Sequence, residues 1–248
     1  MRRTCSRPGA GKDREWLHGH EEAPRECHQP YGSVNSVPFR KRLARYDEPL
    51  MTPIKIGVLA LQGDFDAHRK RLEELGAEVV LVKKPEQLDD IDALVIPGGE
   101  SGTFLKLLGE AGFQRLKQFV ITKPAFGTCA GAILLASEVE NPKQAGLGAI
   151  DIGIRRNAYG RQVDSSIRQG KLINEKLGRS PIEMVFIRAP KIERVGAGVD
   201  VVAIEGSDPV AVRQGKVMAA TFHPELSDDP RVHQAFLDIV RNGNGMQS

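Results

Sequence analysis

The fold of this 248-residue chain is decided by the stretch Lys123-Pro-Ala-Phe-Gly-Thr-Cys-Ala-Gly-Ala-Ile-Leu-Leu-Ala136. A short apolar run meets a Gly-x-Cys-x-Gly turn, and an apolar, alanine-rich run typical of a helix follows. This pattern indicates a nucleophile elbow, in which the nucleophile stands on a sharp turn between a strand and a helix. Only small residues such as Gly127, Ala130 and Gly131 let the backbone pass so closely. We therefore predict that the thiol of Cys129 points into a cleft.

The elbow also suits the chemistry of a thiol. Unpaired N–H groups and the dipole at a helix N-terminus favour the thiolate, which is the form that attacks carbonyl carbon. A free cysteine taken alone is more often a small core residue. The functional interpretation of Cys129 therefore depends on the residues that come beside it.

Upstream of the elbow, strands and helices alternate. We predict strands at 54–61, 78–82 and 93–96 and helices at about 65–75 and 103–120. This alternation is typical of right-handed βαβ units and of a parallel sheet covered on both faces.

The helix expected at 65–75 has its own local signals. Phe65, Arg69, Leu72 and Leu75 recur at helical spacing, and Asp64 or Asp66 can cap the first turn.

Downstream of the elbow the pattern changes to short strands, at 149–154, 184–187 and 199–205. The segments 209–212 and 216–222 flank Gln214-Gly215 and indicate a hairpin. A helix at about 230–241 follows. We predict a single α/β domain with an open, mainly parallel sheet and helices on both faces.

The first fifty residues differ in composition from the rest. They hold ten of the 35 Lys and Arg residues and seven of the 32 Asp and Glu residues, so the remainder carries 25 of each. They show no periodic apolar pattern that could offset the entropy of ordering. We expect 1–51 to be a disordered tail or to precede the true start, because Met51 stands just before the first strand. The domain is expected at 52–243 and a short tail at 244–248.

Charge and cysteine content exclude several classes of protein. Acidic residues interrupt the basic tail, which argues against nucleic acid as a partner. No apolar run approaches the roughly 18 residues of a membrane span. The body of the chain has one cysteine and hence no internal disulfide, as expected in a reducing cytoplasm. A metal site or a nucleotide cofactor is not expected, because ligand spacings and phosphate-binding loops are missing from the sequence.

Three candidate groups follow predicted strands, where functional groups gather in an open parallel sheet. They are Cys129, the Gly98-Gly99 turn and His223-Pro224-Glu225. A thiolate needs a base, the base needs an orienting acceptor, and the oxyanion needs N–H donors. With Pro224 holding an extended backbone, Glu225 can face the imidazole of His223.

Two other histidines, His68 and His233, fall in predicted helices and have no candidate catalytic residue beside them in the sequence. We interpret both as structural or surface residues.

Six motifs together resemble the class I (triad) glutamine amidotransferases, and among them the branch that supplies ammonia to pyridoxal 5'-phosphate synthase. The resemblance covers about 54–241. The motifs are Leu61-Gln-Gly63, Pro97-Gly-Gly-Glu-Ser101, Phe126-Gly-Thr-Cys-Ala-Gly131, Arg156-Asn-Ala-Tyr-Gly-Arg-Gln162, Phe186-Ile-Arg-Ala-Pro190 and Thr221-Phe-His-Pro-Glu-Leu226.

The resemblance implies a flavodoxin-like fold and hydrolysis of L-glutamine by a triad of Cys129, His223 and Glu225. It implies an oxyanion hole from the N–H groups of Gly99 and Ala130. It further implies substrate contacts from the residues Gly99, Glu100, Ser101, Arg156, Ile187 and Arg188. A guanidinium suits the α-carboxylate of glutamine, although Arg156 and Arg188 taken alone would be solvated loop arginines.

The resemblance also implies a partner, a (β/α)8-barrel synthase subunit in a large hetero-oligomer that receives the ammonia. Gln62 is similar to the family residue that helps order the oxyanion loop when the partners dock. A polar residue at that place could instead cap the following helix.

Two alternatives stay open on the sequence. One is another triad glutaminase, such as the subunit feeding imidazole glycerol phosphate synthase, against which the motifs at 156–162 and 186–190 argue. The other is a noncatalytic thiol stress sensor or chaperone on the same fold, against which His223-Pro224-Glu225 argues.

Overall fold

The computed structural model describes residues 54–158, 165–173 and 177–244. All of them belong to one compact unit of the chain, Pro49–Ser248. The tails expected at 1–51 and 244–248 and the second half of the motif at 156–162 lie wholly or largely outside the described residues. The expected domain limits therefore stay predictions.

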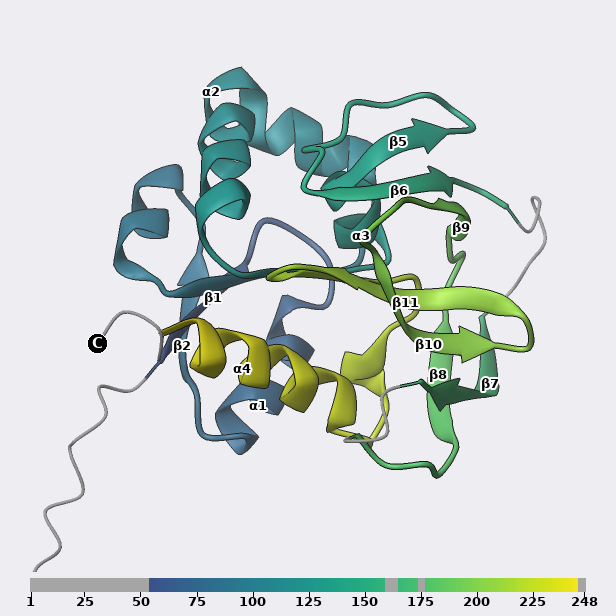
Figure 1. The fold of residues 1–248 in the computed structure, drawn as a ribbon. Helices are drawn as coiled ribbons and strands as arrows, with labels where there is room; N and C mark the ends of the chain where they lie inside the picture. Colours follow the sequence, from purple (N-terminus) through teal and green to yellow (C-terminus); the bar gives the residue numbers. More distant parts are fainter. Residues whose placement is uncertain (1–53, 159–164, 174–176, 245–248) are drawn as a thin grey trace, which may run out of the picture. The chain divides into compact units, whose positions relative to one another are not determined.

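The described residues form a nine-stranded sheet in the order β2-β1-β3-β4-β12-β11-β10-β7-β8 (Figure 1). In that order the strands are β2 (Glu78–Val82), β1 (Lys55–Leu59), β3 (Ala93–Ile96), β4 (Ala125–Thr128), β12 (Val217–Ala220), β11 (Asp208–Gln214), β10 (Asp200–Glu205), β7 (Ser166–Leu172) and β8 (Ile182–Phe186). From β2 to β12 neighbouring strands are parallel, and from β12 to β8 they are antiparallel.

The sheet is thus mixed, whereas the sequence predicted a mainly parallel one. The predicted hairpin explains part of the difference: β11 and β12 are antiparallel around Gly215, which has φ +57°. Parallel neighbours require a long crossover, usually a helix. Between β7 and β12 the described residues contain no α-helix, and the consecutive strands of the large sheet there, β7-β8, β10-β11 and β11-β12, pair antiparallel.

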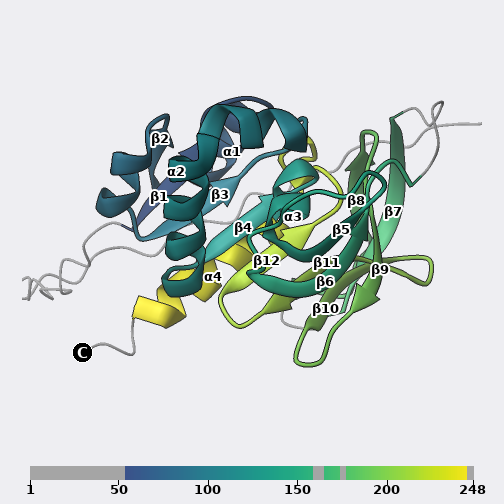
Figure 2. The same ribbon diagram turned by 90° about the horizontal axis from the view of Figure 1, so that it is seen from above.

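Helices cover both faces of the sheet, as predicted (Figures 1 and 2). On one face lie α1 (Phe65–Glu74) and α4 (Arg231–Asn244), and on the other α2 (Ser101–Thr122) and α3 (Ala130–Leu135). Side chains of β3 alternate between the two cores: Ala93 and Val95 pack with α1 and α4, and Leu94 and Ile96 with α2 and α3. None of the described helices combines the length and apolar character needed to cross a membrane.

Three further features complete the described fold. A small sheet, β5-β6-β9, comprises β5 (Ala136–Glu140), β6 (Ile150–Arg155) and β9 (Lys191–Val195). Short 3-10 helices occur at η1 (Pro85–Asp90) and η3 (Pro224–Leu226). Helix α2 is kinked at Gly109, whose φ of +61° is not helical.

The elbow packs tightly against β3. A Cβ atom at Gly131 would lie 2.0 Å from the carbonyl oxygen of Ile96, and one at Gly127 would lie 2.5 Å from the carbonyl group of Gly131. Both contacts are with backbone, which has no flexible end that can move aside. The small residues predicted at this turn are therefore a steric requirement of the fold.

We predict that Gly131→Ala lowers the free energy of unfolding by at least about 1–3 kcal/mol, because the added methyl group overpacks the crossing with β3. Gly243→Ala is the matched control, since a Cβ there meets nothing within 4 Å. Urea unfolding of the full chain measures both. Equal stability of the two variants would contradict the steric account.

Candidate active site

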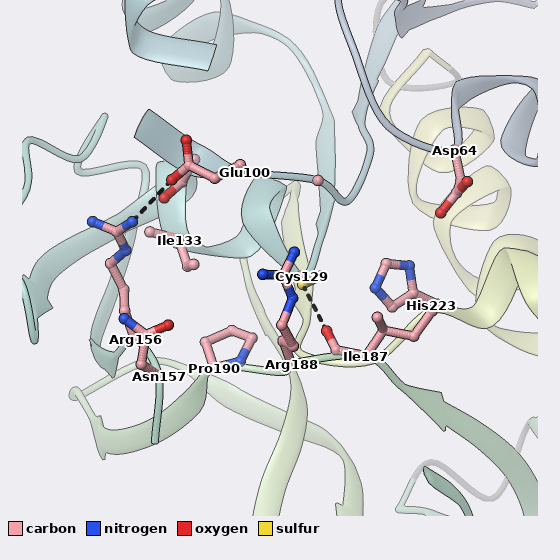
Figure 3. A pocket seen from close by; sticks show the side chains of 12 residues that line it. Asp64, Glu100, Cys129, Ile133, Arg156, Asn157, Ile187, Arg188, Pro190 and His223 are labelled. Carbon is pink, nitrogen blue, oxygen red and sulfur yellow. Dashed lines mark hydrogen bonds and ion pairs between the residues drawn. The ribbon is translucent and has the colours of Figure 1, made fainter. Parts of the chain in front are cut away.

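The ends of three neighbouring parallel strands bring the predicted groups together. β3, β4 and β12 are adjacent in the sheet, and their carboxyl ends lead into Gly98-Gly99, Cys129 and His223. The side chains of Cys129 and His223 face one pocket (Figure 3). The sequence predicted this meeting from the strand pattern, and the structure places all three groups there.

Cys129 stands on a strained turn. Its φ of 47° and ψ of −102° are unusual for a residue with a side chain. Its backbone N–H donates to the carbonyl of Ala220 at 2.8 Å, and its Sγ lies 3.9 Å from the carbonyl oxygen of Ile187. Helix α3 begins at Ala130 but is only six residues long, so the helix dipole contributes less to a thiolate than the sequence suggested.

His223 is the group that can stabilise a thiolate. Its backbone N–H donates to the carbonyl of Val185 at 2.8 Å, and its Nδ1 lies 2.7 Å from Oε1 of Glu225. The predicted pairing is present, but not through an extended backbone: Pro224 and Glu225 form the 3-10 turn η3, which folds the carboxylate back under the imidazole.

The electrostatics follow from the burial of this pair, with His223 3% and Glu225 6% exposed. Burial alone would lower the pKa of His223, but its interactions with Cys129 and Glu225 outweigh burial and raise that pKa to about 10. Burial alone would raise the pKa of Glu225, but His68 and His223 lower it well below its ordinary value. At neutral pH the site therefore holds an imidazolium between a carboxylate and the sulfur.

The Gly98-Gly99 segment lies against the imidazole and against Gln62. A Cβ at Gly98 would lie 2.3 Å from Cε1 of His223. Gly99 has φ +132°, a conformation that favours glycine. The side chain of Gln62 makes two hydrogen bonds with the main chain of Glu100, the residue after Gly99. Its Nε2 donates to the Glu100 carbonyl at 2.7 Å, and the Glu100 N–H donates to its Oε1 at 3.4 Å.

Glu100 is the N-cap of α2. Its carboxylate accepts hydrogen bonds from the backbone N–H groups of Gly102 at 3.0 Å and Thr103 at 2.6 Å. The same carboxylate pairs with Arg156 at 3.1 Å across the pocket (Figure 3). Burial opposes its ionisation, but the hydrogen bonds from Gly102 and Thr103 and the charge of Arg156 lower the pKa of Glu100.

Residues 58–242 match the SNO glutamine amidotransferase family. The chain belongs to this family. It is 66% identical over 191 residues to the pyridoxal 5'-phosphate synthase subunit PdxT of Koribacter versatilis, covering 77% of this chain and 98% of that protein. It is 52% identical over 187 residues to the subunit of the same name from Solibacter usitatus, covering 74% of this chain and 97% of that protein.

Solved structures agree with this membership. A crystal structure of a glutamine amidotransferase is 47% identical with a TM-score of 0.69, covering 75% of this chain and 98% of that one. The structure of PurLQS from Thermotoga maritima is 17% identical with a TM-score of 0.58, covering 76% of this chain and 99% of that one, and shares the fold.

Eight of the residues predicted for the site of this SNO glutamine amidotransferase line one pocket. They are Gly99, Glu100, Ser101, Cys129, Arg156, Ile187, Arg188 and His223. Of the others, Glu225 lies behind His223, Ala130 follows Cys129, and Gln62 forms hydrogen bonds with the main chain of Glu100. Ser101 does not face open solvent: its hydroxyl donates to Gln144 at 2.9 Å.

Four lining residues were not predicted: Asp64, Ile133, Asn157 and Pro190. Asn157 and Pro190 fall inside the quoted motifs, and Ile133 is one turn beyond the nucleophile on α3. Asp64 was expected to cap α1, but its side chain makes no capping hydrogen bond and lies near His223 (Figure 3).

Asp64, His223 and Glu225 each place one nitrogen or oxygen atom within 4.8 Å of the others. His223 and Glu225 are already joined by a hydrogen bond of their own, between Nδ1 and Oε1 at 2.7 Å. The expectation that this family member holds no metal stays a prediction.

His68 and His233, which the sequence left as structural or surface residues, are wholly buried, so the surface alternative is excluded. On α1 the sequence placed Arg69 on the inward stripe, but Arg69 binds Asp66 and Glu73 at the surface and His68 points inward. Periodicity alone could not choose between neighbouring polar residues, because both fit a stripe of helical width.

We predict that the stability difference between wild type and His223→Gln depends on pH. Because the pKa of His223 is raised in the folded state, its protonated form stabilises the fold fully below pH 6.5, and this contribution is lost as pH rises towards 10. Unfolding by urea at pH 6 and pH 10 should show the larger loss for the variant at pH 6.

The control is His233→Gln, because burial lowers the pKa of His233 to about 3 and keeps it neutral over this range. For this control the pH dependence has the opposite sign: the unfolded chain protonates His233 near pH 6.5 whereas the folded chain does not, so the loss for His233→Gln should be smaller at pH 6 than at pH 10. A loss for His223→Gln that does not change with pH would contradict the raised pKa.

Proposed function

We propose that this protein hydrolyses L-glutamine to L-glutamate and ammonia, and that it passes the ammonia to a pyridoxal 5'-phosphate synthase subunit. One observation carries the proposal: a strained elbow cysteine and a buried, hydrogen-bonded His223–Glu225 pair face one pocket. Membership of the SNO glutamine amidotransferase family and the 66% identity to a PdxT subunit support the same substrate and destination.

In the first half of the reaction the Cys129 sulfur attacks the side-chain amide carbon of glutamine. The negative charge that forms on the amide oxygen is stabilised by the N–H groups of Gly99 and Ala130. Removing one such donor costs on the order of 100- to 1,000-fold in kcat in enzymes of this kind. His223 gives its proton to the amide nitrogen, ammonia departs, and a glutamyl thioester remains on Cys129.

In the second half a water molecule attacks the thioester. His223, now neutral, takes a proton from this water, glutamate forms, and the sulfur leaves as a thiolate beside the recharged imidazolium. Glu225 remains ionised throughout and stabilises the imidazolium through Nδ1. The low pKa of Glu225 suits this constant role.

The pocket charges suit the two ends of an amino acid. Arg156 and Arg188 are the cations for the α-carboxylate, and Glu100 is the anion for the α-ammonium group. Glu100 and Arg156 bind each other in the structure, so bound glutamine would exchange one ion pair for two. Gly99, Ser101 and Ile187 line the same pocket and supply the remaining contacts with the substrate.

Free ammonia would be diluted into water as ammonium, which favours direct delivery to a bound partner. We propose a (β/α)8-barrel synthase subunit in a large hetero-oligomer, working in a reducing cytoplasm, with no nucleic acid, membrane or cofactor taking part. We further propose that residues 52–243 form one flavodoxin-like glutamine amidotransferase domain. The parallel half of the sheet and its helices on both faces support this assignment.

The direct test measures glutamate release from L-glutamine by the full chain, with and without the cognate synthase subunit. We expect release that rises with the partner and is abolished in Cys129→Ala, because no other group in the pocket can form the thioester. Labelling of Cys129 by a glutamine-mimicking electrophile should be blocked by glutamine.

No release from the wild-type complex would refute the glutaminase. Oxidation of Cys129 without protection by glutamine would then favour the thiol-sensor alternative.

Gln62→Ala should lower glutamate release in the complex and leave the isolated chain unchanged. The reason is that Gln62 orients the Glu100 peptide next to Gly99, and we propose that this orientation matters when the partner docks. Steady-state kinetics with and without the partner measure the effect, with Gln114→Ala on the outer surface of α2 as the control. An equal loss in both states would show that Gln62 acts within the isolated chain.

A further inference from the structure

Behind the triad, a buried line of polar side chains continues into the core. Nε2 of His68 lies 3.3 Å from Oε2 of Glu225 and 3.0 Å from Oγ1 of Thr128. Nδ1 of His68 lies 3.0 Å from Nε2 of His233. These side chains come from α1, η3, β4 and α4, and His68, Thr128 and His233 are 0% exposed.

Glu225 has two oxygens, and the triad uses only one of them. Oε1 accepts from His223, whereas Oε2 has no partner with hydrogen-bond geometry among the described residues. A buried carboxylate oxygen without a donor is costly. Nε2 of His68 lies 3.3 Å from this oxygen and 3.0 Å from the Thr128 hydroxyl oxygen, so both oxygens face the same ring nitrogen.

The two groups that face Nε2 of His68, the Glu225 carboxylate and the Thr128 hydroxyl, require a hydrogen on this nitrogen. A carboxylate oxygen only accepts hydrogen bonds, so a bare ring nitrogen 3.3 Å away would face it with a lone pair. The neutral Nε2–H tautomer and the imidazolium both place a hydrogen on the nitrogen nearest to Oε2 of Glu225, and only the Nδ1–H tautomer is excluded. His233 fits either form, because its Nε2 can donate to or accept from Nδ1 of His68.

We propose that His68 is a positioning residue of the active site, holding the Glu225 carboxylate from its Oε2 side so that Oε1 stays aligned with Nδ1 of His223. His68 reaches the elbow as well, because Thr128 immediately precedes Cys129. One imidazole thereby joins the acid of the triad to the strand that carries the nucleophile. The inference rests on the proposed glutaminase and deepens it.

The surrounding charges are compatible with this role. Besides His223 and Glu225, the titratable groups around His68 are Asp64 and Arg71 on its own helix and His233 on α4. Burial, then the charges of His68 and Arg71, lower the pKa of His233, so His233 is neutral at working pH. Asp64 lies on the pocket side, near His223.

The test uses the full chain with its synthase subunit. It compares substitutions of His68 that differ in whether they keep an N–H donor near the place of Nε2. His68→Gln keeps an N–H near the place of Nε2, whereas His68→Asn places its amide nearer to Nδ1 and loses contact with Glu225. His68→Leu removes every polar atom. His233→Leu is the matched control, because His233 is equally buried and contacts His68 and Phe126.

We expect His68→Leu and His68→Asn to lower kcat for glutamate release about tenfold or more, with KM for glutamine within about twofold of wild type. The acid limb of the kcat/KM profile should move to higher pH, because Glu225 loses a donor to its ionised form. His68→Gln should stay within about threefold of wild type. His233→Leu should lower the Tm without moving kcat or the acid limb.

Three results would overturn the inference: wild-type kcat in His68→Asn, equal losses in His68→Gln and His68→Asn at equal Tm, or the same loss in His233→Leu. If His68→Leu does not fold, the Gln and Asn variants still decide. An inactive wild-type complex would instead refute the proposed glutaminase, so the two failures are distinguishable.

Discussion

The crossing of the β4–α3 turn over β3 is the constraint on which the rest of the site depends. Gly131 meets the Ile96 carbonyl with no room for a side chain, and Gly98-Gly99 begins two residues after Ile96. On the other side, the N–H of Cys129 binds the carbonyl of Ala220, three residues before His223. These two contacts together set the distance from Cys129 to the Gly98-Gly99 segment and to His223.

Local signals in the sequence were sufficient to predict the features that lie within one strand-turn-helix unit. The elbow, the glycine turn after β3 and the pairing of His223 with Glu225 each depend on residues a few positions apart. The strands β5 and β9 were not predicted, because their burial patterns do not alternate strictly. Strand β7 was not predicted either, and part of its pairing is with β10, much further along the chain. Such pairings are decided by tertiary contacts rather than by propensity.

The same distinction holds in the site. The Glu100–Arg156 pair spans 56 positions and the His68–His233 contact spans 165. No periodic pattern links residues so far apart, and a polar residue on a helix gives no sign of whether it faces water or another polar residue in the core. Asp64 shows the converse limit: a good capping residue at the right position is turned instead toward the pocket.

Glu100 combines three tasks in one residue. Its carboxylate caps α2 and forms an ion pair with Arg156, and its carbonyl group accepts a hydrogen bond from Gln62. A substitution there would disturb helix stability, pocket charge and the oxyanion segment at the same time. Any substitution at position 100 therefore changes three properties at once. If the pocket diverged in evolution to bind a different ligand, we expect the first changes at neighbouring residues that have a single role.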